Sequence, residues 1–432
     1  MREASITRGK WSEMLDKEQR QEILKKRALS AMWGGEPGLG SWYTDAEFDA
    51  IINCVKSSMN PATGFGFICD EIVEFERRFA EFCGTEFAIS ITSAGSGLDM
   101  AMMCLDLGPE DEVIAPITNF PGALYSILGQ GTKLVLCEAD PQTLCVDPAD
   151  IEKRLTPNTR AILATHMNGL SAPMDELEAL CQAHPHPKYG PLKIIGDAAR
   201  AGGARYKGTR VGKRGWMTVH SFHTMKMMTT LGEGGMITTD DPEAARRLRG
   251  LRQWGSGIAD LEGNPYAADD VFEPRWGWGS NYKMTKVQAA VGIVQLSRLD
   301  EMIAARVALA EARTEMLSGV PELQLPYTSP DHGPVYYLYS ILVCPEWAGE
   351  KRDLLMKMLR EEYGVTSVVA NPPGYLANPY LRRHTAGQIL PVSEDIGRRL
   401  FCPGMHPLMT ADDNAYIAAA IIDAVERIRE AK

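Results

Sequence analysis

Residues 87–105 read FAISITSAGSGLDMAMMCL, and this stretch carries the pattern on which the fold prediction depends. A short apolar run at 87–91 is followed by small residues and then by apolar residues at helical spacing. Such a strand–turn–helix unit directs backbone N–H groups and the positive end of the helix dipole toward a bound anion. Thr92, Ser93, Gly95 and Ser96 are therefore candidates for a phosphate site, although an ordinary serine-rich N-cap accounts for the same letters.

The alternation of apolar runs with helical patterns continues along residues 45–240. Helical spacing is present at 45–58 and 70–83. Short apolar runs lie at 87–91, 112–115, 133–137, 161–165 and 192–196. This alternation predicts an α/β fold with a mostly parallel sheet covered by helices. Ligands of such sheets bind at the carboxyl ends of the strands, so the residues that follow each run are the candidate site.

A long helical pattern at 285–318 leads into a second set of strand and helix patterns, including an expected strand at 335–343 (VYYLYSILV). The expected divisions are an N-terminal arm (1–40), a large domain (41–290) and a smaller C-terminal α/β domain (291–432). Residues 371–391 are rich in proline and glycine and are expected to form an ordered loop over a cleft.

Composition excludes several classes of function. The net charge of −11 argues against a protein that binds a nucleic-acid backbone. No apolar run is long enough to cross a bilayer, and the charged N-terminal stretch has no apolar signal core, so a cytoplasmic protein with a solvated N-terminal arm or helix is expected. The nine cysteines form no CxxC pair and are expected to be reduced thiols. His184 and His186 are flanked by prolines and are expected in a loop, not in a metal site.

Three further residues follow apolar runs and have both a structural and a functional interpretation. Asp197 could accept a proton from a ring nitrogen or could cap the next turn, and Phe120 could cover a planar ligand or fill the core. Lys226 lies in the stretch 220–235, HSFHTMKMMTTLGEGG, among apolar side chains. A lysine held out of water has a lowered pKa and is a better nucleophile toward aldehydes, but a surface lysine is equally compatible with this stretch alone.

The combination favours one cofactor. Pyridoxal 5′-phosphate (PLP) requires an anion site, a stacking surface, an anionic partner for its ring nitrogen and a lysine that binds it covalently. Each of these requirements has a candidate directly after an apolar run. A nicotinamide site would instead require GxGxxG after the first strand, and TSAGSG lacks that spacing.

Several ordered segments also carry a family resemblance, which extends from about residue 40 to the C-terminus. They include EFERRFAEFCGTEFAISITSAGSGLDMAM, IIGDAARAGGARYKG, HSFHTMKMMTTLGEGGM and WGSNYKMTKVQAAVGIVQLSRLD. In these segments the chain resembles the DegT-type (DegT/DnrJ/StrS) family. The members of this family are PLP-dependent sugar and cyclitol aminotransferases, and they have the aspartate aminotransferase fold, which is called fold-type I. The resemblance implies a PLP-binding large domain followed by a smaller C-terminal domain.

The resemblance also assigns roles to individual residues. It implies Lys226 as the residue that binds PLP covalently, Asp197 as the partner of the ring nitrogen and Phe120 as the stacking aromatic. The whole implied set of cofactor-binding residues is Ala94, Gly95, Phe120, Asp197, Arg200, Ser221, Lys226 and Asn281. The amides of Ala94 and Gly95, with Ser221 and Asn281, would hold the phosphate. Because the family's asparagine reaches the cofactor of the neighbouring subunit, a homodimer with shared sites is expected. His166 and His223 are the implied substrate residues.

The chain departs from the family pattern at several positions. Arg200 stands at a position where the family usually has Gln or His, and that residue contacts the ring hydroxyl of the cofactor. A cation there could change the electronics of the ring or bind a substrate carboxylate. Asn168 replaces an aromatic residue. The other departures are Ala94, His220, Met225 and Met227. They put a standard nucleotide-sugar acceptor in question without weakening the assignment of the cofactor.

The function implied by the resemblance is transfer of an amino group from an amino acid, Glu or Gln, to a keto-sugar, in the biosynthesis of a natural product or a glycan. A keto-cyclitol acceptor and a different PLP reaction such as dehydration are alternatives. His223 resembles the members that use nucleotide sugars, and the retained Lys226 differs from the histidine of the sugar dehydratases. A non-catalytic regulator is a third class, against which the complete set of cofactor residues argues.

Overall fold

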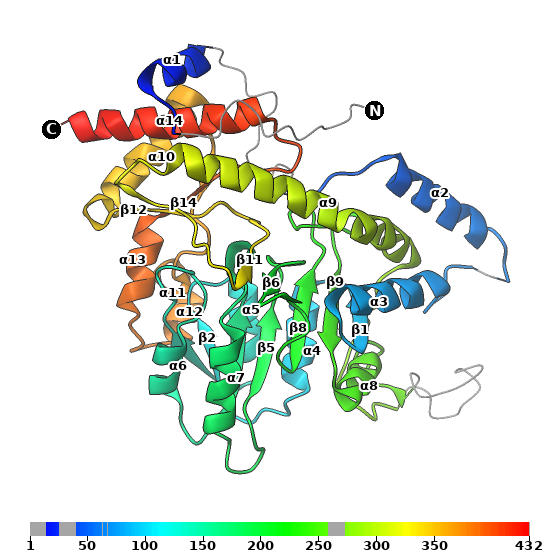
Figure 1. Cartoon of the computed structure of the whole chain (residues 1–432). Coiled ribbons are helices and arrows are strands. Elements are labelled where there is room, and N and C mark those ends of the chain that lie inside the picture. The colour runs from blue at the N-terminus through cyan, green and yellow to red at the C-terminus, as the bar shows by residue number, and fades with distance from the viewer. Residues whose placement is uncertain (1–13, 26–39, 63, 67, 258–272, 432) are drawn as a thin grey trace.

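The computed structural model of the chain describes residues 14–25, 40–62, 64–66, 68–257 and 273–431. Within these residues a seven-stranded sheet forms the centre of the molecule (Figure 1). Its strands are β1 (Phe87–Ile91), β2 (Glu112–Pro116), β3 (Lys133–Cys137), β4 (Thr159–Thr165), β5 (Lys193–Asp197), β8 (Met217–Ser221) and β9 (Gly235–Thr239). The strands β1 to β5 lie at or within two residues of the five predicted apolar runs, because such runs can be buried on both faces of a sheet.

The strand order is β1-β9-β8-β5-β4-β2-β3. β9 is antiparallel to both β1 and β8, whereas the other neighbouring strands are parallel. The carboxyl ends of β1, β2, β4, β5 and β8 therefore lie along one edge, together with the start of β9. The prediction of an α/β fold with a mostly parallel sheet is confirmed.

Helices cover both faces of this sheet. The helices before residue 286 are α1 (Lys17–Lys25), α2 (Asp45–Ser58), α3 (Asp70–Cys83), α4 (Ala94–Met103), α5 (Pro121–Leu128), α6 (Pro148–Arg154), α7 (Met174–Ala183) and α8 (Pro242–Leu251). Apolar side chains of α4, α5 and α8 form one core with one face of the sheet, and those of α3, α6 and α7 form a second core with the other face. The helices expected at 45–58 and 70–83 are confirmed as α2 and α3.

The C-terminal part begins with the long helix α9 (Lys286–Leu317), which runs across the top of the sheet in Figure 1. A four-stranded antiparallel sheet follows, ordered β10 (Leu323–Gln324), β12 (Ile341–Val343), β14 (Leu400–Pro403) and β13 (Ser367–Val368). Its helices are α10 (Glu350–Tyr363), α11 (Gly374–Ala377), α12 (Pro379–His384), α13 (Pro391–Arg399) and α14 (Ala411–Glu430). A small three-stranded sheet is formed by β6 (Arg205–Tyr206), β7 (Thr209–Arg210) and β11 (His332–Gly333). Two short 3-10 helices are η1 (Met167–Gly169) and η4 (Pro345–Trp347).

The helix α9 runs unbroken through the boundary predicted at 290/291. Its residues up to Met302 pack in a core of the large sheet, and its residues from Ala310 onward pack in the C-terminal core. The division into domains stays a prediction. The packing partner changes within one continuous helix, so the helical sequence pattern does not mark a boundary there.

Two expectations for the C-terminal part are wrong in detail. Of the strand expected at 335–343, Ile341–Val343 alone is a strand, because the preceding backbone bonds to η1: the Val335 N–H donates to the Gly169 carbonyl at 2.9 Å. Residues 371–391, expected to form an ordered loop, contain the helices α11 and α12. This segment docks on the edge strand β3, where the side chain of Gln388 accepts from the Leu136 N–H and donates to the Leu134 carbonyl, which covers hydrogen-bonding groups that an edge strand exposes.

The described part of the N-terminal arm forms a helix that is mostly exposed but is anchored by a few buried side chains. Leu15 and Ile23 are buried in the C-terminal core, and α1 lies against α14 (Figure 1). Arg20 forms an ion pair with Glu426 at 2.7 Å. The apolar positions of α1 are few, so the pairing with α14 was not evident from the charged sequence.

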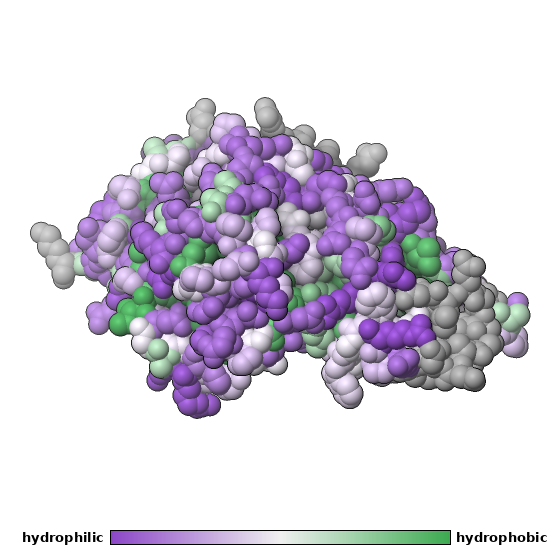
Figure 2. Space-filling model, turned by 90° about the horizontal axis from the view of Figure 1, so that it is seen from below, coloured by the Kyte–Doolittle hydropathy of each residue, from purple (hydrophilic) through white to green (hydrophobic). Residues whose placement is uncertain are grey.

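The face seen from below in Figure 2 is mainly hydrophilic, and its apolar residues form small separate groups. No helix among the described residues is long and apolar enough to span a membrane.

Glu138 joins the C-terminal part to the large sheet. Its buried carboxylate accepts hydrogen bonds from the Val392 N–H at 3.2 Å, the Ser393 N–H at 2.8 Å and the Ser393 hydroxyl at 2.6 Å. These groups lie at the start of α13, where backbone N–H groups lack partners within the helix.

Replacing Glu138 by Ala leaves these donors unpaired and should lower the free energy of unfolding by about 1–3 kcal/mol. Urea unfolding measures the change. The matched control is Glu110→Ala, which removes an exposed ion pair with Lys133 and should change the same quantity by about 0.5 kcal/mol or less. Equal effects of the two substitutions would contradict the role of Glu138.

Candidate active site

Lys226 lies in the connection between β8 and β9. The two strands pair antiparallel up to Ser221 and Gly235, and the connection is closed by a hydrogen bond from the Phe222 N–H to the Gly234 carbonyl at 2.9 Å. Met227 and Met228 are buried beside Phe222 in the core under the sheet. The methionines therefore anchor the connection from below, which gives Met227 a packing role next to the lysine.

The Lys226 amine is held among charged groups and one aromatic ring. Its Nζ lies 5.1 Å from the centre of the Tyr337 ring, and the guanidinium of Arg200 lies 5.6 Å from the same centre. Burial lowers the pKa of Lys226 from 10.5 to about 8, and the neighbouring Arg200 cation acts in the same direction. Asp197 and Glu233 oppose the shift. The amine is thus neutral in an appreciable fraction of molecules near neutral pH, as a nucleophile requires.

Asp197 ends β5 and is 5% exposed. Its Oδ1 accepts one hydrogen bond, from the Ala199 N–H at 3.0 Å, and the described part of the chain offers it no ion pair. Burial raises the pKa of this carboxyl, while Lys226 and Arg200 lower it. A buried carboxylate with so few partners is costly unless another donor reaches it, so the site is incomplete as a protein-only arrangement.

The start of α4 has free backbone amides of the kind that an anion site requires. Ser93 caps the helix and its Oγ accepts from the Ser96 N–H at 3.2 Å. The N–H groups of Ala94 and Gly95 have no acceptor in the described chain. A Cβ on Gly235 would lie 2.9 Å from the Ala94 nitrogen, so a glycine is needed where β9 passes this turn. Ser221, which pairs with Gly235, lies beside the same free amides.

Phe120 lies at the carboxyl end of β2, as the N-cap of α5. Its ring is 63% exposed, and its backbone N–H donates to Asn119 at 2.8 Å. Asn119 is held in turn by a bond to the hydroxyl of Thr165, the last residue of β4. An exposed phenylalanine on a fixed turn at this edge is available to cover a planar ligand.

The structure does not bring His166 to these residues. Its ring is 2% exposed and lies against Gly196, where a Cβ would be 3.0 Å from its Nε2. Gly196 and Asp197 are successive residues of β5, so their side-chain directions point to opposite faces of the sheet. The Nδ1 of His166 accepts from the Ala172 N–H at 3.0 Å, and burial lowers its pKa to about 4. This geometry is that of a neutral histidine that holds a turn, and it does not support a role for His166 in binding the substrate.

His223 and Asn281 lie nearer the edge but in different settings. The Nδ1 of His223 accepts from the Met225 N–H at 3.3 Å, and its Nε2 lies 3.7 Å from a Glu233 carboxylate oxygen. Asn281 is exposed, and its neighbour Tyr282 accepts a hydrogen bond from the Thr92 N–H at 2.9 Å. This places Asn281 on the outside, next to the turn that leads into α4.

Sequence reasoning missed two residues of the site, Tyr337 and Asn371. Both come from the C-terminal part, and no local pattern connects them with β5. Arg200 donates to the side-chain oxygens of Asn168 and Asn371, in each case at 2.9 Å. A partial signal existed, because asparagine is one of the few residues that tolerate a positive φ, and Asn168 and Asn371 have φ of 51° and 48°.

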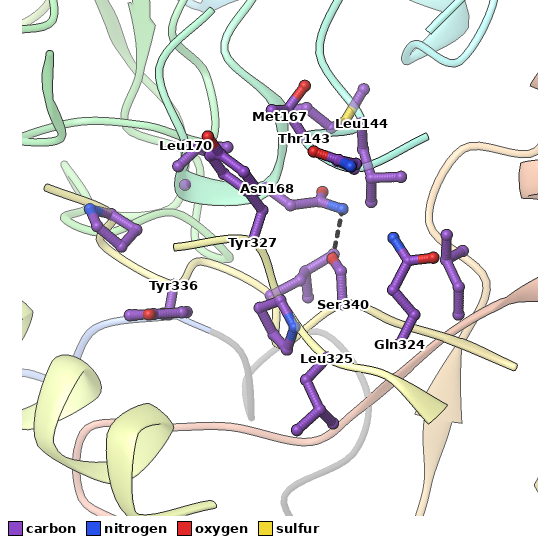
Figure 3. A pocket seen from close by; sticks show the side chains of 16 residues that line it. Thr143, Leu144, Met167, Asn168, Leu170, Gln324, Leu325, Tyr327, Tyr336 and Ser340 are labelled. Carbon is purple, nitrogen blue, oxygen red and sulfur yellow. Dashed lines mark hydrogen bonds between the residues drawn. The ribbon is translucent and has the colours of Figure 1, made fainter. Parts of the chain in front are cut away.

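A small cavity lies behind Asn168, between η1 and the C-terminal segment that includes Tyr336 and Ser340 (Figure 3). The amide of Asn168 donates to the Ser340 hydroxyl across it at 2.9 Å. Its volume of about 40 Å³ holds no more than a few waters. Lys226 is not among the residues that line this cavity. The cavity is therefore not the candidate reaction site.

A family model for the DegT/DnrJ/EryC1/StrS aminotransferase family matches residues 51–422, most of the chain. The chain belongs to this family. The family resemblance in the sequence is thereby confirmed, as is the fold-type I architecture that it implied. Family members are PLP-dependent aminotransferases, and the protein is one of these enzymes.

The relatives of this aminotransferase act on sugars. It is 32% identical over 387 residues to the dTDP-3-amino-3,4,6-trideoxy-alpha-D-glucose transaminase of Streptomyces venezuelae, with 89% of this chain and 94% of the relative covered. It is 32% identical over 375 residues to the GDP-perosamine synthase of Caulobacter vibrioides, with 86% and 94% covered. An aminotransferase structure from Psychrobacter cryohalolentis aligns with a TM-score of 0.81 at 27% identity, covering 90% of this chain and 98% of that one.

The residues at the edge fit PLP. Asp197 is a buried carboxylate with a single hydrogen-bond donor, the amides of Ala94 and Gly95 lack an acceptor in the described chain, and Phe120 is exposed on the same edge. A ring nitrogen, a phosphate and an aromatic face supply what these groups lack. Lys226 is the amine that the carbonyl of the cofactor requires.

The pKa of Lys226 has a consequence for cofactor attachment. The rate at which PLP becomes covalently attached to the cofactor-free protein, trapped by borohydride and followed by mass spectrometry, should rise with pH to a midpoint near 8. Arg200→Gln should move this midpoint upward, because removing a neighbouring cation favours the protonated amine. A midpoint near that of an ordinary lysine would contradict the burial of the amine.

Proposed function

We propose that this aminotransferase moves an amino group from an amino acid, Glu or Gln, to a keto-sugar, in the biosynthesis of an amino sugar. The observation that carries the proposal is the meeting of Lys226, Asp197 and the free amides of Ala94 and Gly95 at one edge of the sheet. The sugar substrates in the names of the relatives support the choice of acceptor. A keto-cyclitol is the alternative acceptor.

Each residue contributes a separate task. When bound, PLP supplies a carbonyl that holds the amino group and a ring that withdraws electrons. Asp197 keeps a proton on the ring nitrogen, because a buried carboxylate favours a charged donor beside it. The Lys226 amine, with a pKa of about 8, accepts a proton from the substrate carbon and returns it as general base and acid.

Binding and orientation fall to the remaining residues. The amides of Ala94 and Gly95 and the Ser221 hydroxyl hold the phosphate at the positive end of α4. Phe120 covers one face of the ring and limits the access of water. His223, whose ring is fixed by Met225 and Glu233, stays a candidate substrate residue at the mouth of the site.

We infer in addition that the active form is a homodimer. Trp278 is 85% exposed and lies three positions before Asn281, which is also exposed. Large exposed apolar side chains mark interaction surfaces, and Asn281 would then reach the phosphate in the neighbouring subunit. Sedimentation of the purified protein and a weaker retention of PLP by Asn281→Ala would support this arrangement.

The transaminase proposal is tested by its first half-reaction. L-Glutamate or L-glutamine, added to the PLP-loaded enzyme without acceptor, should change the absorption of the cofactor in a single turnover. Lys226→Ala should abolish both this change and covalent attachment of PLP, whereas Asp197→Ala should retain attachment and slow the change by about a hundred-fold or more. Lys188→Ala, which alters an exposed lysine, should behave as wild type.

Other outcomes separate the alternatives. An unaltered rate in Asp197→Ala would refute its role, and no spectral change with any amino acid would refute transamination. Release of water from a sugar without amine transfer would favour the dehydratase alternative. A second half-reaction, in which matched keto-sugars and keto-cyclitols are compared, decides between the two acceptors.

A further inference from the structure

Arg200 is a cation whose two hydrogen-bond partners are both neutral. Its Nη1 donates to the Asn168 oxygen and its Nη2 to the Asn371 oxygen, each at 2.9 Å. No carboxylate of the described residues lies within ion-pair distance of it. Two buried arginines differ in this respect, since Arg160 pairs with Asp111 and Arg252 with Glu76. The buried Arg313, like Arg200, has neutral partners.

The position of Arg200 is unfavourable for a protein without a ligand. The guanidinium and the Lys226 amine both lie within 6 Å of the centre of the Tyr337 ring, and Arg200 disfavours the charged form of that amine. A partly buried cation beside a second amine costs free energy that hydrogen bonds to two amides offset in part. An anion placed next to Arg200 would remove this cost.

The two asparagines fix the direction of the guanidinium. Asn168 is buried in η1 and is held by Ser340, and Asn371 precedes α11 in the C-terminal part. Both have the left-handed backbone conformation that asparagine tolerates. An arginine has five N–H donors, and these two bonds leave the others for a ligand. Arg200 is thus pre-oriented by residues from both parts of the chain.

We propose that Arg200 binds the α-carboxylate of the amino acid substrate, and that Asn168 and Asn371 position it for this purpose. The inference rests on the proposed transamination and names how the amino donor is recognised. The planar guanidinium suits a carboxylate, which it can bind through two parallel hydrogen bonds.

The distance from the reacting nitrogen favours a carboxylate over a phosphate. In an amino acid a single carbon atom separates the amino nitrogen from the carboxylate, so an amine that takes the place of the Lys226 amine on the cofactor carries its carboxylate close to that position. In a nucleotide sugar most of the sugar ring separates the new amine from the diphosphate. Arg200, which shares the Tyr337 ring with Lys226, is therefore at the place of the carboxylate.

The test converts each neutral partner into a competing anion. Asn371→Asp and Asn168→Asp keep the side-chain shape, tolerate the left-handed backbone and give Arg200 an internal ion pair. Binding of glutarate, a dicarboxylate without an amine, to the PLP-loaded enzyme is measured by calorimetry, with the neutral diamide glutaramide as the control ligand. Each variant should weaken glutarate binding and raise the KM for L-glutamate by about ten- to a hundred-fold.

Further variants separate the effect from general damage. Arg200→Gln should give the same loss, and Arg200→Lys a smaller one, because a point charge lacks the planar fork. Asn158→Asp adds the same charge before β4, at the opposite edge of the sheet, and should leave glutarate affinity unchanged. Covalent attachment of PLP should persist in all five variants, which shows that they fold.

Three results would overturn the inference. The first is glutarate binding within two-fold of wild type in Asn371→Asp and Arg200→Gln, whatever happens to the absorption of the cofactor. The second is a loss confined to the keto-sugar acceptor, which would assign Arg200 to a diphosphate. The third is equal binding of glutaramide and glutarate. Failure of the proposed function is distinct, since it would appear as a wild-type enzyme that binds glutarate but undergoes no half-reaction with any amino acid.

Discussion

The parallel pairing of β4, β5 and β8 is the constraint on which the site depends. Thr165 pairs with Asp197, and Asp197 pairs with Val219, two residues before Ser221. Because parallel strands end at the same edge, residues far apart in the chain meet there without any contact that is specific to the ligand. The antiparallel strand β9 starts at this edge and passes the turn before α4 at Gly235, which brings the Lys226 connection beside the free amides.

The electrostatics of the edge follow from burial. Asp197 and Lys226 are removed from water, so the pKa of the carboxyl is raised and that of the amine is lowered. Arg200 adds a cation that neither of its amide partners neutralises. The apolar packing of Met227 and Met228 beneath the connection keeps this cluster rigid. The cluster is consequently prepared for a ligand with a positive ring nitrogen and a negative carboxylate.

The C-terminal part completes the site by docking on η1. A Cβ on Gly169 would lie 2.6 Å from the Tyr337 nitrogen, so a glycine is needed for the two backbones to approach. This approach brings the Tyr337 ring to Lys226 and, with the contact of the 371–391 segment on β3, brings Asn371 to Arg200. The same docking explains why the strand expected from residue 335 begins only at Ile341: its backbone groups bond to η1 instead.

The sequence by itself determined the strand–turn–helix order, the family, and Lys226, Asp197 and Phe120 as residues that end or follow strands. These features are local: apolar periodicity, small residues before a helix and the chemistry of single side chains. Tertiary structure decided that His166 faces the other side of the sheet and that Tyr337, Asn168 and Asn371 surround Arg200. The contacts of Arg200 with Tyr337 and Asn371 join segments more than a hundred residues apart. They depend on how two separately packed cores dock, which no local pattern encodes.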